Sequence, residues 1–159
     1  RENHLPVEDI EVIAKQVHQY WLDIERKKGS DKPTMQEWAD LDESDRDSNR
    51  LQVMDMMRKL EKFHYKIVSS GKAKGIRHFT ESEIEKMAEM EHARWMNEKT
   101  AKGFTYGQPR NDDLKIHDCL LPWSDLDEKT KQLDRNAVKI IPELIKSVGF
   151  AVVKENSKE

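Results

Sequence analysis

The sequence predicts a mainly α-helical fold with short β pieces, built from two helical-hairpin repeats that are related by pseudo-two-fold symmetry. Three observations favour this fold: apolar residues recur at helical intervals, glycines and a proline end the helical runs, and the second half of the chain repeats the first. Among the 159 residues, 36% are apolar and 37% are charged, whereas an average chain has roughly 25% charged residues. Such a chain can form only a thin core, which suits helices with solvated outer faces.

The first predicted hairpin consists of two helices and an extended tail. Residues 10–28 carry apolar side chains at spacings of three and four, and Gly29 follows as the residue that ends the helix. A second helix over residues 44–63 is expected to begin near a cap at Asp40. Its predicted inward face consists of Leu51, Val53, Met54, Met57 and Leu60. The tail, residues 65–68, is β-branched and aromatic, which is typical of a strand.

The second predicted hairpin begins after a glycine-containing linker, residues 69–78. Thr80 and the glutamate three residues later have the spacing of a capping box, so a third helix is expected to start there. The last helical run, residues 130–148, contains Pro142, which predicts a kink or a break. Residues 150–153 form a second extended tail, which can pair with the tail of the first hairpin.

Two constant offsets align the halves of the chain. An offset of 74 pairs His18 with His92, Trp21 with Trp95 and Gly29 with Gly103, and an offset of 85 pairs Trp38 with Trp123 and Arg50 with Arg135. Tryptophans that match in two constant registers indicate an internal duplication. The change of offset marks an insertion between the glycine and the second tryptophan, and only the second copy has it.

The predicted organisation is a degenerate copy at residues 1–68, the linker at 69–78, a copy with the inserted loop at 79–153 and a solvated tail at 154–159. Neither hairpin is large enough to enclose a core by itself. The two copies are therefore expected to form one compact unit. Because the chain opens at Arg1 rather than at a methionine, we also expect it to be a domain of a larger parent protein.

The second copy contains a tryptophan, a Gly-Phe-Thr-Tyr-Gly segment, a histidine, a Leu-Pro-Trp segment and a closing Gly-Phe pair. These motifs lie at Trp95, residues 103–107, His117, residues 121–123 and residues 149–150. In these features the chain resembles the RyR domain, the repeat found in pairs in the cytosolic part of ryanodine receptors and also in bacterial and phage proteins. Residues 81–153 match this pattern nearly throughout, whereas residues 7–68 match only its helical frame. The Asp134-Arg135 start of the last helix resembles bacterial or phage members more than the receptor repeats.

The resemblance implies a mostly helical module with short β pieces and no established catalytic activity. In the channels this repeat is a peripheral regulatory module. Bacterial versions occur attached to other domains, and sensing of nucleotide-like ligands is a proposed role for them.

The candidate ligand-binding residues lie in the inserted loop or beside it: Trp95, Tyr106, Arg110, Asp112, His117 and Trp123. An arginine can hold a phosphate or a carboxylate through two hydrogen bonds. An aspartate can accept a hydrogen bond from a ribose hydroxyl, and a tyrosine ring can stack on a planar ligand. The alternative interpretation is that the loop is solvated surface and that its aromatic residues only pin it to the helices.

A second set of residues is predicted to hold the fold: His18, Trp21, Trp38, His92, Gly103, Gly107 and Arg135. His92 is expected to bind a backbone carbonyl. Arg135 is expected to bind Glu91, Glu98 or carbonyls of the loop. Gly107 is expected to supply a positive φ in a tight turn.

Several kinds of site are disfavoured by the sequence. The single cysteine excludes an internal disulfide and fits a reducing, cytoplasmic location. No metal site is predicted, because His117, Asp118 and Cys119 are adjacent and adjacent residues rarely reach one ion. No cofactor is predicted either, and no glycine loop of the phosphate-cradling type is present. The net charge of −3 argues against nucleic-acid binding, and no apolar run approaches the ~20 residues of a membrane span.

The favoured function is a non-catalytic regulatory module that senses a small anionic or nucleotide-like ligand. The alternative is a structural protein–protein interaction module without such a ligand, which docks to other domains of the parent protein or to a partner. A hydrolase or transferase that uses His117 or His92 is the third hypothesis, and it requires an exposed imidazole beside a carboxylate and a nucleophile.

Overall fold

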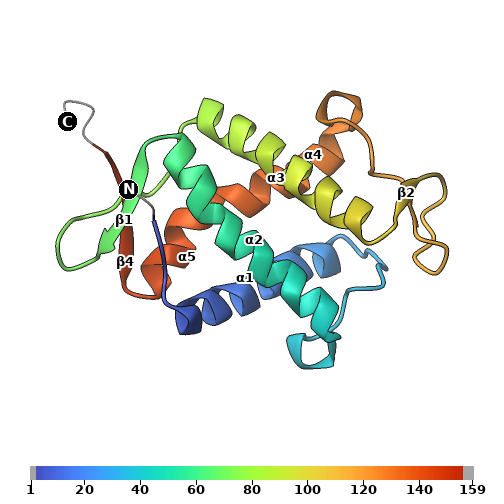
Figure 1. The fold of residues 1–159 in the computed structure, drawn as a ribbon, viewed down its shortest axis with the longest axis horizontal. Coiled ribbons are helices and arrows are strands. Elements are labelled where there is room, and N and C mark those ends of the chain that lie inside the picture. The colour runs from blue at the N-terminus through green and yellow to red at the C-terminus, as the bar shows by residue number, and fades with distance from the viewer. Residues whose placement is uncertain (1–2, 156–159) are drawn as a thin grey trace. The chain divides into compact units, whose positions relative to one another are not determined.

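The computed structural model describes residues 3–155 and is mainly helical, with two short two-stranded sheets (Figure 1). It divides into two compact units. One unit contains Arg1–Phe79 and Lys139–Glu159, and the other contains Thr80–Val138. Of the predicted solvated tail, residues 156–159 lie outside the described residues.

The first unit contains helices, a 3-10 turn and a strand pair: α1 (Val7–Lys27), η1 (Trp38–Asp40), α2 (Glu43–Lys62), β1 (Tyr65–Ser69), α5 (Ile141–Ser147) and β4 (Phe150–Lys154). Within this unit α1 packs against α2 and α5, and α5 packs against β4. The core is made of apolar side chains from all of these helices and from both strands, among them Ile13, Leu22, Val53, Leu60, Ile145 and Val152.

Strands β1 and β4 pair in the antiparallel direction, with Tyr65 opposite Lys154 and Ser69 opposite Phe150. The predicted pairing of the two extended tails is thus confirmed, and β1 extends one residue into the predicted linker. Ile76 of that linker also contacts β4, because its amide N–H donates to the carbonyl of Val152.

The predicted helix ends agree with the structure at most positions. Gly29 and Gly149 both have a positive φ and follow the C-cap residue of a helix. Thr80 and Glu83 form the predicted capping box. The predicted break at Pro142 is confirmed, because α4 (Glu128–Lys139) ends and α5 begins there with the proline in its first turn.

Two predictions about α2 were wrong. Its N-cap is Asp42, whose side chain accepts from the amide N–H of Asp45, and not Asp40. Its inward face is also rotated from the predicted one, because Leu51 is 49% exposed and Met54 is 50% exposed. The buried positions are Val53, Met56, Lys59 and Leu60. Their spacing of three and four defines a face that excludes positions 51 and 54.

The second unit contains α3 (Glu81–Ala101), β2 (Thr105–Tyr106), β3 (Ile116–His117), η2 (Trp123–Asp125) and most of α4. The inserted loop leaves the end of α3, forms the small β2–β3 pair and returns to η2, which packs against α3 (Figure 1). No helix in residues 3–155 combines the length and the apolar character needed to cross a membrane.

Candidate functional site

The base of the candidate site is a cluster of three rings on α3 and η2. The imidazole of His92 lies between two indoles, with its centroid 5.7 Å from that of Trp95 and 6.1 Å from that of Trp123. Its Nε2–H donates to the carbonyl oxygen of Leu121 at 2.7 Å. The prediction that His92 binds a backbone carbonyl is therefore confirmed. This bond holds the end of the inserted loop against α3.

The pKa of His92 is raised although burial opposes its charge. A hydrogen bond with Asp134 and the bond to the Leu121 carbonyl outweigh the cost of desolvation. The His92 Nδ1 atom lies 3.6 Å from the Asp134 carboxylate. The protonated ring can donate from both nitrogens, one to a carbonyl and one to a carboxylate.

The first unit contains the same contacts at the residues aligned by the two offsets. The Nε2–H of His18 donates to the carbonyl of Gln36 at 2.5 Å. The His18 ring centroid lies 5.8 Å from that of Trp21 and 6.2 Å from that of Trp38. A His–Trp–Trp cluster therefore pins a loop to a helix in each unit.

Arg135 anchors α4 to α3 in the second unit. Its guanidinium binds the Glu85 carboxylate through two hydrogen bonds of 2.8 and 3.1 Å and lies over the Trp123 ring. The predicted partners Glu91 and Glu98 were wrong, because both bind Arg94 on their own helix. The prediction that Arg135 binds a glutamate of α3 was right, but Glu85 lies nearer the N-terminal end of α3 than Glu91 and Glu98 do. In the first unit Arg50 binds Glu11 in the same two-bond manner.

The inserted loop is closed by a short ladder of hydrogen bonds. Gly103 ends α3 with a φ of +91°. The Thr105 amide donates to the Lys115 carbonyl at 2.9 Å, and the Gly107 amide donates to the His117 carbonyl at 3.3 Å. This ladder brings the start and the end of the loop together.

The predicted reason for Gly107 was wrong, because its φ is not positive. A Cβ at this position would lie 2.7 Å from Cγ2 of Ile116. Glycine is needed here because the two strands approach closely, not because the backbone is left-handed.

His117 is buried at the end of the ladder, against Trp95. The two ring centroids are 4.7 Å apart and the planes cross at 78°, an edge-to-face arrangement. The amide N–H of Cys119 donates to His117 Nδ1 at 3.1 Å. Burial, followed by the charge of Arg110, lowers the pKa of His117 to about 4. The imidazole is therefore neutral at pH 7, with its proton on Nε2.

Arg110 and Asp112 form an ion pair inside the loop. Nε and Nη2 of Arg110 donate to the two carboxylate oxygens of Asp112, at 2.7 and 3.1 Å. The hydrogen bond from Arg110 lowers the pKa of Asp112. Asp112, one of the predicted ligand-binding residues, thus fixes the orientation of the Arg110 guanidinium.

Lys99, which the sequence did not single out, lies beside this pair. It is on the last turns of α3, and its Nζ is 4.8 Å from the centroid of the Phe104 ring. Burial, and then the positive charges of Lys102 and Arg110, lower the pKa of Lys99. Within residues 3–155 no carboxylate lies within ion-pairing distance of its Nζ, whereas Lys102 pairs with Glu98 at 3.0 Å.

A comparison of the two halves could have found Lys99. The offset of 74 aligns it with Glu25, which is fully buried and pairs with Lys28 and Lys32 at 3.0 Å each. The negative Glu25 aligns with the positive Lys99, and this change of sign indicates that Lys99 has a different role from Glu25.

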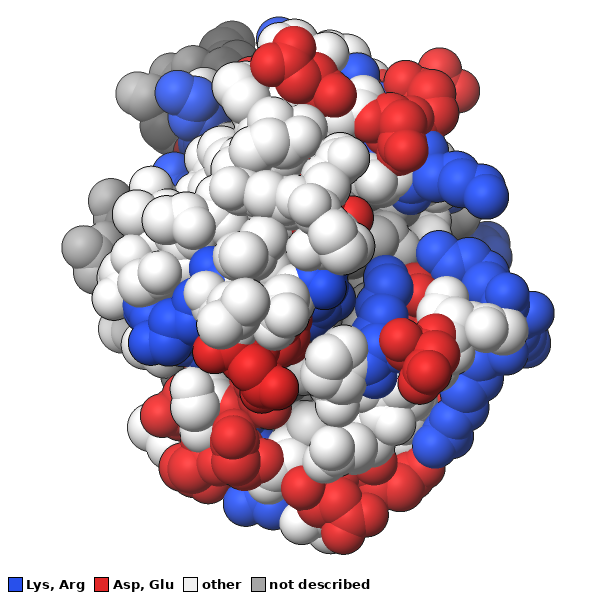
Figure 2. All heavy atoms as spheres, turned by 90° about the vertical axis from the view of Figure 1, so that its right-hand side faces the viewer, with Lys and Arg blue, Asp and Glu red and all other residues white. Residues whose placement is uncertain are grey.

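The outer part of the loop is exposed. Tyr106 is 49% exposed and Leu114 is 68% exposed. On the face that carries this loop, basic and acidic side chains are interspersed among uncharged ones (Figure 2). Such a surface favours local recognition by a few placed groups over attraction by a broad field of one sign.

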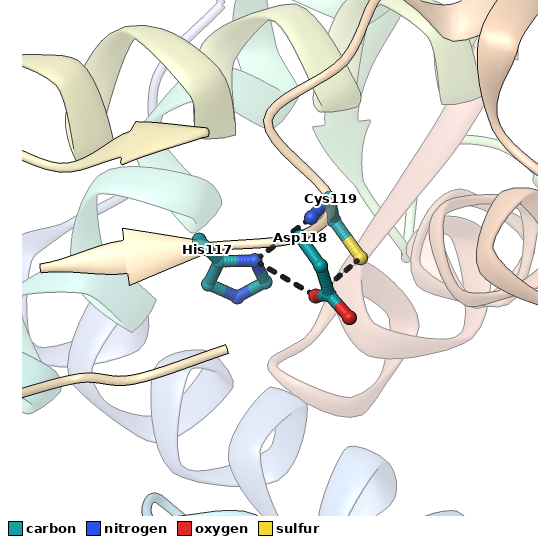
Figure 3. Close-up of side chains that lie close together, drawn as sticks. All are labelled: His117, Asp118 and Cys119. Carbon is teal, nitrogen blue, oxygen red and sulfur yellow. Dashed lines mark hydrogen bonds and ion pairs between the residues drawn. The ribbon is translucent and has the colours of Figure 1, made fainter. Parts of the chain in front are cut away.

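His117, Asp118 and Cys119 lie together where the loop turns towards η2 (Figure 3). Their potential ligand atoms all lie within 4.8 Å of one another. The sequence predicts no metal site on the premise that adjacent side chains diverge, and here three adjacent side chains converge.

Residues 75–154, half of the chain, match the RyR domain. This match contains the motifs at residues 81–153 on which the resemblance was based. The chain belongs to the RyR domain family.

Proposed function

We propose that this chain is a non-catalytic regulatory module that binds a small anionic, nucleotide-like ligand at the end of α3 and the inserted loop. The observation that carries the proposal is the pair of part-buried cations, Lys99 and Arg110. The Nζ charge of Lys99 is disfavoured by burial and by repulsion from the guanidinium of Arg110. A bound anion would relieve both costs at once.

The geometry of Arg110 supports a role in holding that anion. Asp112 binds its Nε and Nη2 atoms, which fixes the plane of the guanidinium and leaves the Nη1 edge for another acceptor. A guanidinium with a fixed plane loses little conformational entropy when it binds a phosphate or a carboxylate. Lys99 would supply the second charge as a point cation.

Tyr106 supplies a reason to favour a nucleotide-like ligand over a bare anion. Its ring is at the edge of the same loop and is half exposed. An exposed tyrosine ring can stack on a planar group, and its hydroxyl can donate or accept a hydrogen bond. The proposed ligand thus has a planar group beside one or more phosphates.

The environments of both candidate catalytic histidines favour the absence of catalysis. His92 and His117 are buried, and each ring is held by a backbone hydrogen bond and by an indole. A hydrolase or transferase would need one of these rings to face a substrate.

We also propose that the helical frame, which consists of α1, η1 and α2 in one half and α3, η2 and α4 in the other, arose by internal duplication. The support is the set of matched contacts, in which a histidine binds a carbonyl and an arginine binds a glutamate in each unit. The inserted loop, which only the second copy has, would then be the acquired part that carries recognition.

The alternative is a docking module for another domain or protein. The observation that favours it is the exposure of Leu114 and Tyr106 on one loop. Exposed apolar side chains on a closed loop are common at protein interfaces. In that case Lys99 and Arg110 would bind acidic side chains of the partner.

Isothermal titration of the 159-residue chain with pyrophosphate, nucleoside phosphates and cyclic nucleotides tests the proposal. We expect one compound of this panel to bind at one site per chain, and Lys99→Gln or Arg110→Gln to weaken it at least about tenfold. Lys86→Gln, an exposed lysine on the same helix, serves as the matched control and should leave the affinity unchanged. Absence of binding to a folded chain by every compound would refute the proposal and leave the docking module.

A further inference from the structure

We propose that His117, Asp118 and Cys119 form a binding site for a divalent transition-metal ion, with Zn²⁺ as the best chemical fit. The three residues offer an imidazole nitrogen, a carboxylate oxygen and a thiol sulfur, all within 4.8 Å of one another (Figure 3). This site is separate from the proposed anion site at Lys99 and Arg110. Metal binding there does not require that an anion is bound.

The backbone explains why three consecutive side chains converge. β3 ends at His117, and the chain then turns back so that the Cys119 amide donates to His117 Nδ1. A second hydrogen bond tightens the same turn: the Leu121 amide donates to the Cys119 carbonyl at 2.8 Å. In an extended strand these side chains would alternate between opposite faces; in this turn they gather on one side.

Two of the three separations between the ligand atoms fit a tetrahedral ion. His117 Nδ1 is 3.5 Å from Asp118 Oδ1, and the Cys119 sulfur is 3.6 Å from the same oxygen. Bond lengths of about 2.0–2.3 Å from zinc to nitrogen, oxygen and sulfur give ligand–ligand distances of roughly 3.3–3.6 Å at the tetrahedral angle. The remaining pair, imidazole and sulfur, lies within 4.8 Å, so the side chains must draw closer when the ion binds.

The donor set selects the kind of ion. A thiolate and an imidazole favour zinc and its neighbours in the first transition series over calcium or magnesium, which prefer oxygen. Binding converts the thiol into a metal thiolate and releases its proton to solvent. The ion also takes the Nδ1 lone pair that now accepts the Cys119 amide, so the chain must give up one hydrogen bond.

The surroundings suit an ion that enters from solvent. His117 is held in place by the β2–β3 ladder and by the Trp95 ring, so one ligand is already oriented. The Asp118 side chain is 45% exposed, and Cys119 is part-buried. Three protein ligands leave a fourth position for water or an added molecule, as in zinc sites that are not closed by four side chains.

Titration of the reduced 159-residue chain with Co²⁺, followed by absorption, tests the site directly. Because Cys119 is the only cysteine, any thiolate-to-cobalt charge-transfer band must arise from it. We expect this band to saturate at one ion per chain and to disappear when Zn²⁺ is added. No band at saturating Co²⁺ would overturn the proposal.

Matched variants decide whether all three residues bind the ion. Cys119→Ser should abolish the band, and Asp118→Asn and His117→Gln should each weaken Co²⁺ binding at least about tenfold. The exposed residues Asp113 and His78 provide controls, since Asp113→Asn and His78→Gln should leave the midpoint unchanged. If Asp118→Asn and His117→Gln fold, as judged by circular dichroism, and bind Co²⁺ as tightly as the parent chain, then only the thiol binds the ion and the site does not exist.

Discussion

The imidazole of His117 meets the indole of Trp95 edge to face, with ring centroids 4.7 Å apart. This contact joins the inserted loop to α3. It places the loop beside Lys99, four residues further along the same helix, so the loop is held against the helix that carries the proposed anion site.

The buried, neutral His117 should make the chain less stable in mild acid. Its folded pKa of about 4 is below the ordinary value of 6.5, so the unfolded chain takes up the proton first as the pH falls. The stability that this residue contributes is complete above about pH 6.5 and is lost between that pH and about pH 4. Between about pH 7.5 and pH 5 the parent chain should lose roughly 2 kcal/mol more than His117→Gln.

Urea unfolding of both proteins at the two pH values, with a chelator present, measures this difference. Groups that do not interact with His117 titrate equally in both proteins and cancel. An equal loss of stability in the two proteins would mean that His117 titrates normally.

The pair of His92 and Asp134 should have the opposite pH dependence. The folded pKa of His92 is raised, so its contribution is complete below the unfolded pKa of about 6.5 and is lost as the pH rises through the folded value. Asp134→Asn should therefore destabilise the chain more at pH 6 than at pH 8.

The first unit offers a matched test of the same pair. The offset of 85 aligns Asp134 with Asn49, so the first half has an amide at the position where the second half has the carboxylate that pairs with His92. Asn49→Asp should add stability at pH 6 that is absent at pH 8. Thermal unfolding at the two pH values reads out both variants, and a pH-independent effect of Asp134→Asn would contradict the assigned role.

Gly107→Ala should destabilise the loop through a steric clash. The new Cβ would lie 2.7 Å from Cγ2 of Ile116, and overpacking of this kind costs about 1–3 kcal/mol. Gly71→Ala is the control, because its Cβ would meet nothing closer than 3.9 Å. Ile116→Ala removes the clashing methyl, so the double variant should lose less than the sum of the single losses. Additive losses in urea unfolding would show that the clash is relieved elsewhere.

Lys99→Met should leave the stability of the chain unchanged or raise it. Burial and neighbouring cations lower the pKa of Lys99, so its charge acts against folding at pH 7, and a methionine of similar length keeps the contact with Phe104. The control is Lys102→Met, which removes the ion pair with Glu98 and should not stabilise. A clear loss of unfolding free energy in Lys99→Met would mean that the lysine holds the fold rather than a ligand.

The sequence predicted the parts of the molecule that follow local rules. The capping box at Thr80, the helix-ending glycines and the break at Pro142 depend on a few adjacent residues, and all three were confirmed. The pairing of the tails was confirmed as well, and so was the bond from His92 to a carbonyl.

The misplaced cap of α2 was a local error, since Asp42 and not Asp40 accepts from the amide three residues further on. The other wrong predictions share a physical cause, which is dependence on tertiary packing. The face of α2 is chosen by its neighbours, so the exposure of Leu51 and Met54 could not be deduced from apolar spacing alone. The sequence predicted Gly107 as a turn residue, but a glycine is needed there because Ile116 approaches closely across the β2–β3 pair. The partner of Arg135 depends on where α4 crosses α3. The burial of Lys99 beside Phe104 and near Arg110 could not be predicted, because it depends on how the inserted loop folds against α3.

The most direct test of the anion site is a nuclear magnetic resonance titration of the isotope-labelled chain with pyrophosphate. We predict that the Arg110 Nε–H signal and the amides of residues 99–117 shift together and saturate, and that Arg110→Gln abolishes these shifts. If the signals of residues 99–117 stay unchanged at saturating pyrophosphate, or if the shifts persist in Arg110→Gln, then the inserted loop does not hold an anion as proposed.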